Sequence, residues 1–252
     1  DFTMIWGFPG STSRYLTASG VKFRMEKYFP PLIEVFGKKL EIWKKHMDAN
    51  QRVKIKYASN YAMIANSWKY FIGQKKGVKK LHVYAQKKIF EKQFANWLRA
   101  KPARKAKYGN VLNGIDKVYA KESKFIEPII YASITGVSGS EIIGFTQKLS
   151  GLKGFMEQFK REKNKNQKVK KEEKVKKEIQ KLSDGLNEMY KDYDPATDRD
   201  VFAAMTRFYV EKVPANLQPE YLTKLVKKFK SNYKALADYV FKKSVLSSKK
   251  HL

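Results

Sequence analysis

The sequence predicts an all-α fold, a bundle of long antiparallel helices that follows a short strand-like segment at the N-terminus. Two observations support this prediction. Apolar residues recur at intervals of three and four over most of the chain, which is the period of an amphipathic helix. Hydrophobic residues make up 42% of the 252 residues, which is enough to fill a sizeable core in one large domain or two small ones.

The chain opens with a predicted strand and a first helix. Residues 3–10 alternate in polarity into a Gly-Pro-Gly break, a pattern typical of a strand that ends in a turn. A helix capped by Thr17 or Ser19 is expected to follow. The prolines Pro30 and Pro31 are expected to end this helix and to supply the first turn of the next one.

The second helix is predicted to reach about Met47 and to turn one apolar face toward the core. The residues of this face are Leu32, Ile33, Phe36, Leu40 and Trp43. Their helical spacing makes Trp43 a packing residue in this interpretation.

The central element is a helix over residues 51–73 that is apolar on two faces instead of one, which predicts burial on both sides. One face is an aromatic stripe of Tyr57, Tyr61, Ile64 and Trp68. The opposite face holds Ser59, Ala62, Asn66 and Tyr70. Because a buried amide needs hydrogen-bond partners, Asn66 is either a satisfied packing residue or a group that faces a ligand.

Gly73 and Gly77 are predicted to bracket a short turn after the central helix. A long amphipathic helix over residues 78–99 should follow and stop before Pro102. Two long helices joined by a short turn are expected to pack as an antiparallel hairpin. A further helix over residues 108–132 is expected to bend or break near Pro128.

Early in the second half of the chain lies a Gly-rich region at 136–144, the most convincing candidate for a domain boundary. Residues 160–182 are almost purely Lys and Glu, which favours a solvated helix with pairs such as Glu172–Lys176, or a mobile excursion, over a nucleic-acid arm. A helix then starts at Asp194 or Thr197, and two final helices cover about 219–230 and 233–246.

The charge of the chain suggests acidic partners. Lys and Arg total 53 against 24 Asp and Glu, which gives a formal net charge of +29. No helix-turn-helix or aromatic RNA-binding motif accompanies this charge, so no nucleic acid is expected as a partner. The electrostatic field of this positive charge could steer acidic peptides toward the protein, or the charge could simply keep a Lys-rich surface soluble. A basic helical module for nucleic-acid binding or protein interaction, without enzymatic activity, is the alternative.

Several kinds of chemistry find no support in the residues. The chain has no cysteine, and His46, His82 and His251 lack metal-ligand spacing, so neither a metal nor a cofactor is expected. No apolar run approaches the roughly 20 residues of a membrane span. The serine turn at 138–141 lacks the G-x-S-x-G elbow, and no catalytic residue is therefore predicted.

Three stretches carry a resemblance to a known family: GFPGSTSRYLTASGV at 7–21, KYASNYAMIANSWKYFIGQKKGVKKL at 56–81 and YKDYDPATDRDVFAAM at 190–205. In order and spacing they resemble the dipeptidyl peptidase 7 and 11 family of bacterial serine exopeptidases. The resemblance implies a chymotrypsin-like double β-barrel with a His-Asp-Ser triad, and an inserted helical domain that caps its cleft. Residues 1–13 would be a strand and linker of the barrel, and 14–252 the cap, with a charged excursion at about 160–182.

The resemblance also implies a role for Asn66, which matches the asparagine that holds the free amino terminus of the peptide in this family. Its neighbours Asn60, Tyr61, Trp68 and Lys69 are weaker candidates for substrate contact. None of the triad residues lies in this chain, so the chain alone should be inactive.

The parent protein is therefore expected to be a serine-type dipeptidyl aminopeptidase that acts on oligopeptides in the periplasm or outside a bacterial cell. Because the chain begins at Asp1 without a Met, it is expected to be a piece of that longer protein, with the missing barrel as its partner. One branch of the family prefers Asp or Glu in the second position, and the +29 charge favours this branch. The resemblance leaves open a homodimeric parent.

Overall fold

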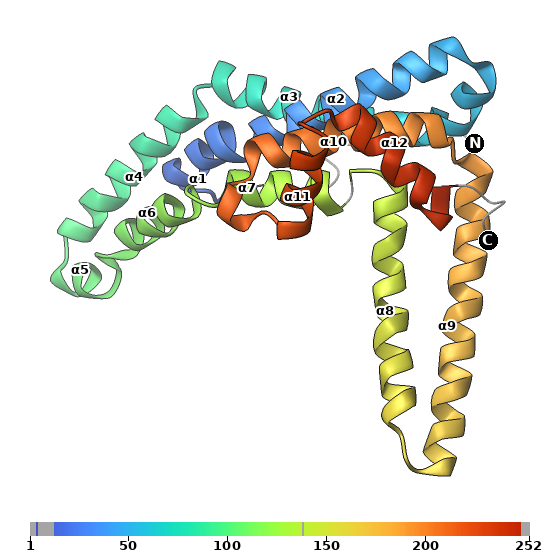
Figure 1. Cartoon of the computed structure of the whole chain (residues 1–252). Helices are drawn as coiled ribbons and strands as arrows, with labels where there is room; N and C mark the ends of the chain where they lie inside the picture. Colours follow the sequence, from blue (N-terminus) through green and yellow to red (C-terminus); the bar gives the residue numbers. More distant parts are fainter. Residues whose placement is uncertain (1–3, 5–12, 138, 248–252) are drawn as a thin grey trace. The chain divides into compact units, whose positions relative to one another are not determined.

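The computed structural model describes Met4, residues 13–137 and residues 139–247. Every element in these ranges is helical, which confirms the all-α prediction (Figure 1). The predicted strand at 3–10 lies outside the described residues, apart from Met4. The chain forms two compact units, unit 1 from Asp1–Pro30 and Ile72–Ile126, and unit 2 from Pro31–Phe71 and Glu127–Leu252. The Gly-rich region at 136–144 thus lies inside unit 2.

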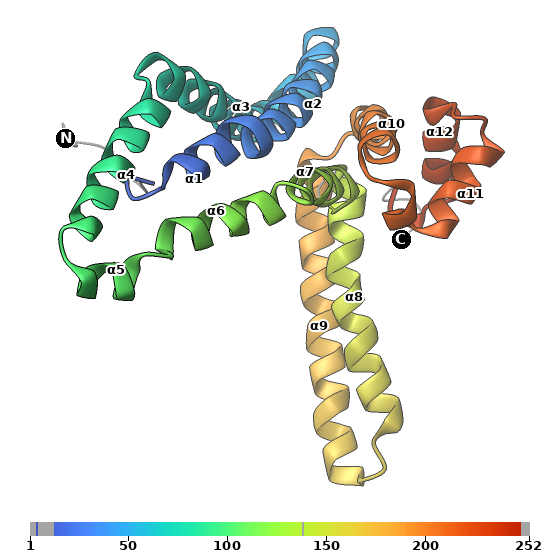
Figure 2. The ribbon, with the colours of Figure 1, turned by 90° about the vertical axis from the view of Figure 1, so that its left-hand side faces the viewer.

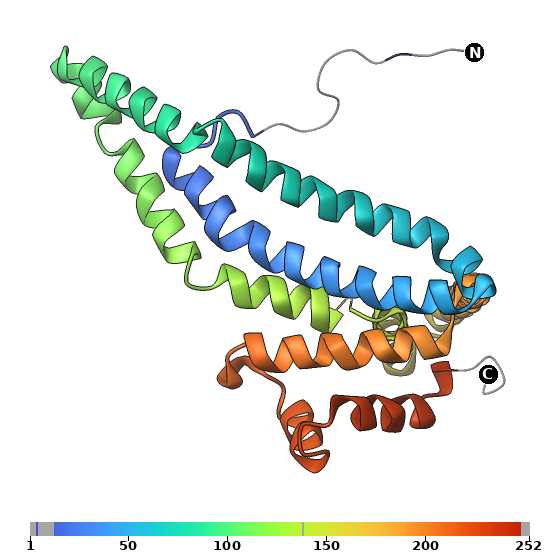
Figure 3. The ribbon, with the colours of Figure 1, turned by 90° about the horizontal axis from the view of Figure 1, so that it is seen from above.

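Unit 1 is built around a short N-terminal helix that lies between two others (Figure 3). Its complete elements are α1 (Ala18–Phe23), η1 (Arg24–Tyr28), α4 (Val83–Arg99), α5 (Pro102–Tyr108) and α6 (Val111–Glu122). The Thr17 hydroxyl caps α1 by accepting from the Gly20 N–H at 3.3 Å. Glu91 on α4 accepts from the Ala18 N–H at 2.7 Å, and the Phe23 ring packs on Tyr119 of α6.

The predicted break at Pro30 and Pro31 is wrong, because the chain stays helical from α1 through η1 into α2 (Phe29–Ala49). The reason is the π-helical turn η1, in which the Phe29 N–H donates to the carbonyl of Arg24, five residues back. A π turn is wider than an α turn. It accommodates proline rings that lack an N–H and would crowd the preceding turn of an ordinary helix.

The predicted turn at Gly73 and Gly77 is also wrong. Helix α3 (Gln51–Lys80) runs through both glycines, since one Gly costs only about 1 kcal/mol in a helix interior. The chain turns at His82, whose φ of 49° is left-handed. Helix α4 then packs against α1 and α5, so the predicted antiparallel hairpin of the two long helices does not form.

Unit 2 contains most of α2 and α3 and the remaining helices. Its other elements are α7 (Ile126–Tyr131), η2 (Ala132–Val137), α8 (Glu141–Arg161), α9 (Lys165–Asp192), α10 (Pro195–Lys212), η3 (Ala215–Leu217), α11 (Glu220–Lys228), α12 (Tyr233–Lys243) and η4 (Val245–Ser247). The chain breaks between α6 and α7, just before Pro128, as predicted.

Helices α8 and α9 form a long antiparallel hairpin (Figures 1 and 2). Residues 160–182 make its turn, at 162–164, and much of α9, and they are mostly exposed. The predicted Glu172–Lys176 ion pair is present at 2.8 Å. The charged segment is therefore the solvated helix that its composition indicated.

Helix α10 connects the two hydrophobic clusters of unit 2. Val201 and Met205 belong to the cluster that α10 forms with α2, α3 and α7. Phe202 belongs to the second cluster, with residues of α8, α11 and α12. Figure 3 shows α10 and α12 side by side. Because α10 packs on two sides, it holds the elements of unit 2 together.

Gly139 is expected to be irreplaceable on steric grounds. An added Cβ would overlap with the Thr135 carbonyl oxygen and would lie only 2.9 Å from the Met205 Cβ. Gly139→Ala should lower the free energy of unfolding by about 1–3 kcal/mol, because a packed core does not yield easily. Denaturant unfolding measures the change.

Gly144→Ala is the matched control for this substitution. Gly144 lies within α8 and has no atom within 4 Å of an added Cβ. This variant should be stabilised by about 0.5–1 kcal/mol, because Ala orders more readily in a helix. Equal effects of the two substitutions would contradict the steric explanation.

Candidate functional site

Helix α3 carries all the residues that the sequence predicts for a substrate site. It starts immediately after α2 because Asn50 interrupts the helix and caps the next one. The Asn50 Oδ1 accepts from the Arg52 N–H at 2.9 Å and from the Val53 N–H at 3.4 Å. An asparagine side chain is a strong N-cap, and this cap sets the register of α3.

The aromatic stripe of α3 packs as predicted. Tyr57 is 1% exposed, and its ring meets the Trp43 ring edge-on at 5.3 Å. The indole N–H of Trp68 donates to the carbonyl oxygen of Ile33 at 3.0 Å. These contacts with α2 fix the rotation of α3 about its own axis, and they confirm that Trp43 is a core residue.

The opposite face of α3 is exposed, so the prediction that both faces are buried is wrong for the described structure. Ser59, Ala62, Asn66 and Tyr70 are all exposed. Ile55 and Met63, also on this side, are 70% and 63% exposed. We call these six residues the uncharged stripe. A lack of charge does not by itself require burial, because small and polar side chains such as Ser59, Ala62 and Asn66 gain little from leaving water.

The five predicted site residues divide between two places on α3. Tyr61, Trp68 and Lys69 line a cavity of about 300 Å³ between α2 and α3. Asn66 lies on the uncharged stripe, about 60° around the helix from Lys69. Asn60 is half-buried and lines neither place. The structure thus brings together three of the four weaker candidates and separates them from Asn66.

Unit 2 contains a buried polar cluster that the sequence did not predict. Its centre is Asp198 of α10, which is 1% exposed and reaches the start of α8. The Asp198 carboxylate accepts from the Glu141 N–H at 2.7 Å, the Ile142 N–H at 3.1 Å and the Ser140 hydroxyl at 3.2 Å. A remote side chain therefore caps α8 in place of a local one.

This geometry excludes Ser140 as a nucleophile. Its hydroxyl is engaged by Asp198, and the residue is 1% exposed. A serine nucleophile needs a histidine base within hydrogen-bond reach. His46, the histidine of unit 2 that the structure describes, is bonded through its Nε2 to Asp200 at 2.9 Å.

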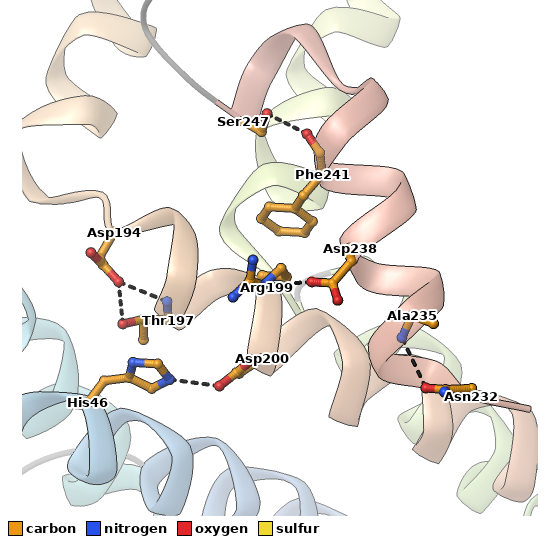
Figure 4. A network of polar contacts seen from close by, with 10 residues as sticks. All are labelled: His46, Asp194, Thr197, Arg199, Asp200, Asn232, Ala235, Asp238, Phe241 and Ser247. Carbon is orange, nitrogen blue, oxygen red and sulfur yellow. Dashed lines mark hydrogen bonds and ion pairs between the residues drawn. The ribbon is translucent and has the colours of Figure 1, made fainter.

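Helix α10 is also the centre of a more exposed polar network (Figure 4). It begins at Asp194, whose Oδ1 accepts from the Thr197 N–H at 2.8 Å, which confirms Asp194 as the cap. Asp200 pairs with His46 of α2, and Arg199 pairs with Asp238 of α12 at 3.2 Å. The first turn of α10 thus ties α2 and α12 into unit 2.

The described part of the chain offers no site for a metal ion, since no group of three or more acidic or histidine side chains comes together there. Among the helices of that part, none is both long and apolar enough to cross a membrane.

Comparisons with known proteins identify relatives over the whole length. A sequence model of the family described as Peptidase S46 matches residues 1–252. Dipeptidyl-peptidase 7 of Porphyromonas gingivalis is 38% identical over 98% of this chain. The Asp/Glu-specific dipeptidyl-peptidase of Capnocytophaga gingivalis is 31% identical, also over 98% of this chain. Each alignment covers 32% of the relative.

A solved structure shares the fold. The crystal structure of Porphyromonas endodontalis DPP11 in complex with the dipeptide Arg-Glu aligns with a TM-score of 0.73 at 20% identity. The alignment covers 97% of this chain and 33% of that one. The helical arrangement is therefore one that occurs within a protein about three times as long. By the match along its entire length, the chain belongs to the peptidase S46 family.

Proposed function

We propose that this chain is the helical substrate-capping domain of a serine-type dipeptidyl peptidase that removes dipeptides from the amino terminus of oligopeptides. One observation supports the proposal most: Asn66 is exposed in the middle of an uncharged stripe on a helix whose other face is fixed by packing. The chain that carries it spans about a third of the dipeptidyl peptidases it matches.

The chemistry of Asn66 suits recognition of a free amino terminus. An amide oxygen accepts a hydrogen bond from an ammonium group, and the bond to a charged donor is stronger than a neutral one. Because α3 is held by Tyr57 and Trp68, this acceptor would keep a constant position. If the amino terminus is fixed at Asn66, the second peptide bond of the substrate lies at a constant distance from this residue. Cleavage of that bond releases a dipeptide.

The remaining two-thirds of such a protein would supply the catalytic barrel and the triad. We place the parent protein in the periplasm or outside a bacterial cell, where peptides from degraded proteins are available. Tyr61, Trp68 and Lys69, which line one cavity, are candidates for contact with the barrel or the peptide. Asn60 remains the weakest candidate.

Two features bear on the second position of the substrate. The net charge of +29 favours attraction of acidic peptides. The relatives of higher identity, at 38% and 37%, carry the name dipeptidyl-peptidase 7 rather than Asp/Glu-specific dipeptidyl-peptidase. Paired substrates that differ only by Glu or Leu in the second position would distinguish the two branches by kcat/KM.

The requirement for a free amino terminus tests the proposal. The full-length protein that contains this chain is expected to release dipeptides from a free peptide and to leave the N-acetylated form of the same peptide intact. Mass spectrometry of the products measures both. Cleavage of the acetylated peptide at a comparable rate would overturn the proposal, and salt-dependent binding to nucleic acid at physiological ionic strength would favour the basic-module alternative.

A further inference from the structure

Two carboxyl groups from distant parts of the sequence meet where the α8–α9 hairpin begins. Glu141 is the first residue of α8, and Asp198 lies in the first turn of α10. Both belong to unit 2, and neither lines the cavity beside the predicted site residues. They are therefore separate from the proposed peptide site and call for an explanation of their own.

The two carboxyl groups are not equivalent. Asp198 is surrounded by donors: besides the two amides and the Ser140 hydroxyl, it accepts from the Tyr193 hydroxyl at 3.4 Å. A carboxylate that accepts this many hydrogen bonds is stabilised in its ionised form. Burial works in the opposite direction and raises the pKa of Asp198.

Glu141 has a much poorer environment for a negative charge. Its Oε1 is buried and has no hydrogen-bond partner among the described residues. Burial, and after it the neighbouring charge of Asp198, raise the pKa of Glu141 to about 7. A buried carboxylate oxygen without a donor is costly, whereas a protonated carboxyl group carries no charge to desolvate.

Titratable groups from every surrounding element affect the pKa of Glu141. The titratable groups that face Glu141 are Lys39 from α2, Tyr57 from α3, Tyr193 and Asp194 before α10, and Asp198 within α10. Lys39 and the Tyr57 hydroxyl lower the pKa of Glu141, and Asp194 adds to the increase. Together they do not offset burial and Asp198, so the net direction is upward.

We infer that Glu141 is a proton-dependent contact that fixes the start of the α8–α9 hairpin to α2, α3 and α10. With a neutral Glu141, the buried group sits among these elements without an uncompensated charge. Ionisation places two negative charges side by side in the interior and loosens the attachment of α8. This inference does not depend on the proposed peptidase function.

The direction of the pH effect follows from the raised pKa. Glu141 binds its proton more tightly in the folded protein than in the unfolded chain, where the ordinary value is 4.5. Its contribution to stability is therefore complete below pH 4.5 and is lost as the pH rises to about 7. Above this range, the contribution does not change further.

Glu141→Gln tests the inference, because glutamine has the shape of the protonated group and does not titrate. Between pH 4.5 and 7, the unfolding equilibrium constant of the wild-type protein should rise on the order of 100-fold more than that of Glu141→Gln. Urea unfolding at a series of pH values measures both. The same pH dependence in the two proteins would overturn the inference.

Two further measurements keep the test decisive if Glu141→Gln folds poorly. Tyr57→Phe removes a hydroxyl that lowers the pKa of Glu141. The stability of this variant should therefore continue to fall up to a higher pH than that of the wild-type protein. Hydrogen exchange of the Glu141 and Ile142 amides should also become less protected as the pH rises, relative to amides in the middle of α8. If Tyr57→Phe lost stability over the same pH range as the wild type, or if the amides along α8 were equally protected from hydrogen exchange at every pH, a proton-dependent contact at Glu141 would be contradicted.

Discussion

Replacement of Asn66 by alanine in the full-length protein is expected to lower kcat/KM about 10- to 100-fold for peptides with a free amino terminus. The loss corresponds to one hydrogen bond to a charged group, about 1.5–3 kcal/mol. Because Asn66 is exposed and no core residue depends on it, the variant should unfold at the same denaturant concentration as the wild type. Steady-state kinetics and urea unfolding together separate binding from folding.

Asn187→Ala provides the control for this experiment. Asn187 is an exposed asparagine on the surface of α9, so its substitution removes the same side chain from a helix without touching α3. It should leave kcat/KM unchanged. Wild-type kinetics in Asn66→Ala, or equal losses in the two variants, would rule out the anchoring role of Asn66.

Replacement of Asp198 by alanine is expected to lower the free energy of unfolding by about 3–5 kcal/mol. The substitution removes the acceptor of the first two amides of α8 and of the Ser140 hydroxyl, all of which are buried or nearly so. Each buried donor left without a partner costs about 1–3 kcal/mol. Denaturant unfolding of the two proteins at one pH measures the difference.

Asp192→Ala is the matched control, with the same substitution six residues away. Asp192 ends α9 and is exposed, and a negative charge is unfavourable at the C-terminus of a helix. This variant should therefore be as stable as the wild type or slightly more stable. If Asp198→Ala behaves like Asp192→Ala, the capping of α8 by Asp198 does not stabilise the protein.

The sequence predicts those parts of the fold that depend on local pattern. Helix α10 starts at Asp194, as its composition indicates, because a capping side chain acts within three residues. Trp43 is buried, since its spacing from other apolar residues of α2 is visible in the sequence. The Glu172–Lys176 pair forms for the same reason, as both partners lie on one helix.

The exposed face of α3 shows that a sequence pattern can be compatible with more than one structure. A stripe with no charge has two explanations, burial in a core or a surface that meets a partner. Ser59, Ala62 and Asn66 fit both explanations. The contacts of α3 with α2, such as the packing of Tyr57 on Trp43, decide which side of α3 faces inward. The prolines Pro30 and Pro31 are ambiguous in a similar way, because a preceding π turn converts a helix end into a continuous helix.

The capping of α8 could not be predicted, because its partners are far apart in the chain. Asp198 bonds to Ser140, Glu141 and Ile142 across 56 to 58 positions. In the sequence, Asp198 is one acidic residue in the first turn of a helix, which is a common and usually exposed position. The Ser140 side chain, which precedes α8 in the sequence, does not cap that helix in the structure.

The α8–α9 hairpin has the geometry of a lever whose base is this capped turn. Helix α8 has 21 residues and is therefore about 30 Å long. A rotation of about 10° at its first turn would displace the far end by roughly 5 Å, by geometry on that length. A change of one proton at Glu141, near the base, would thus be magnified at the loop between Arg161 and Lys165, where a pair of spin labels would detect it.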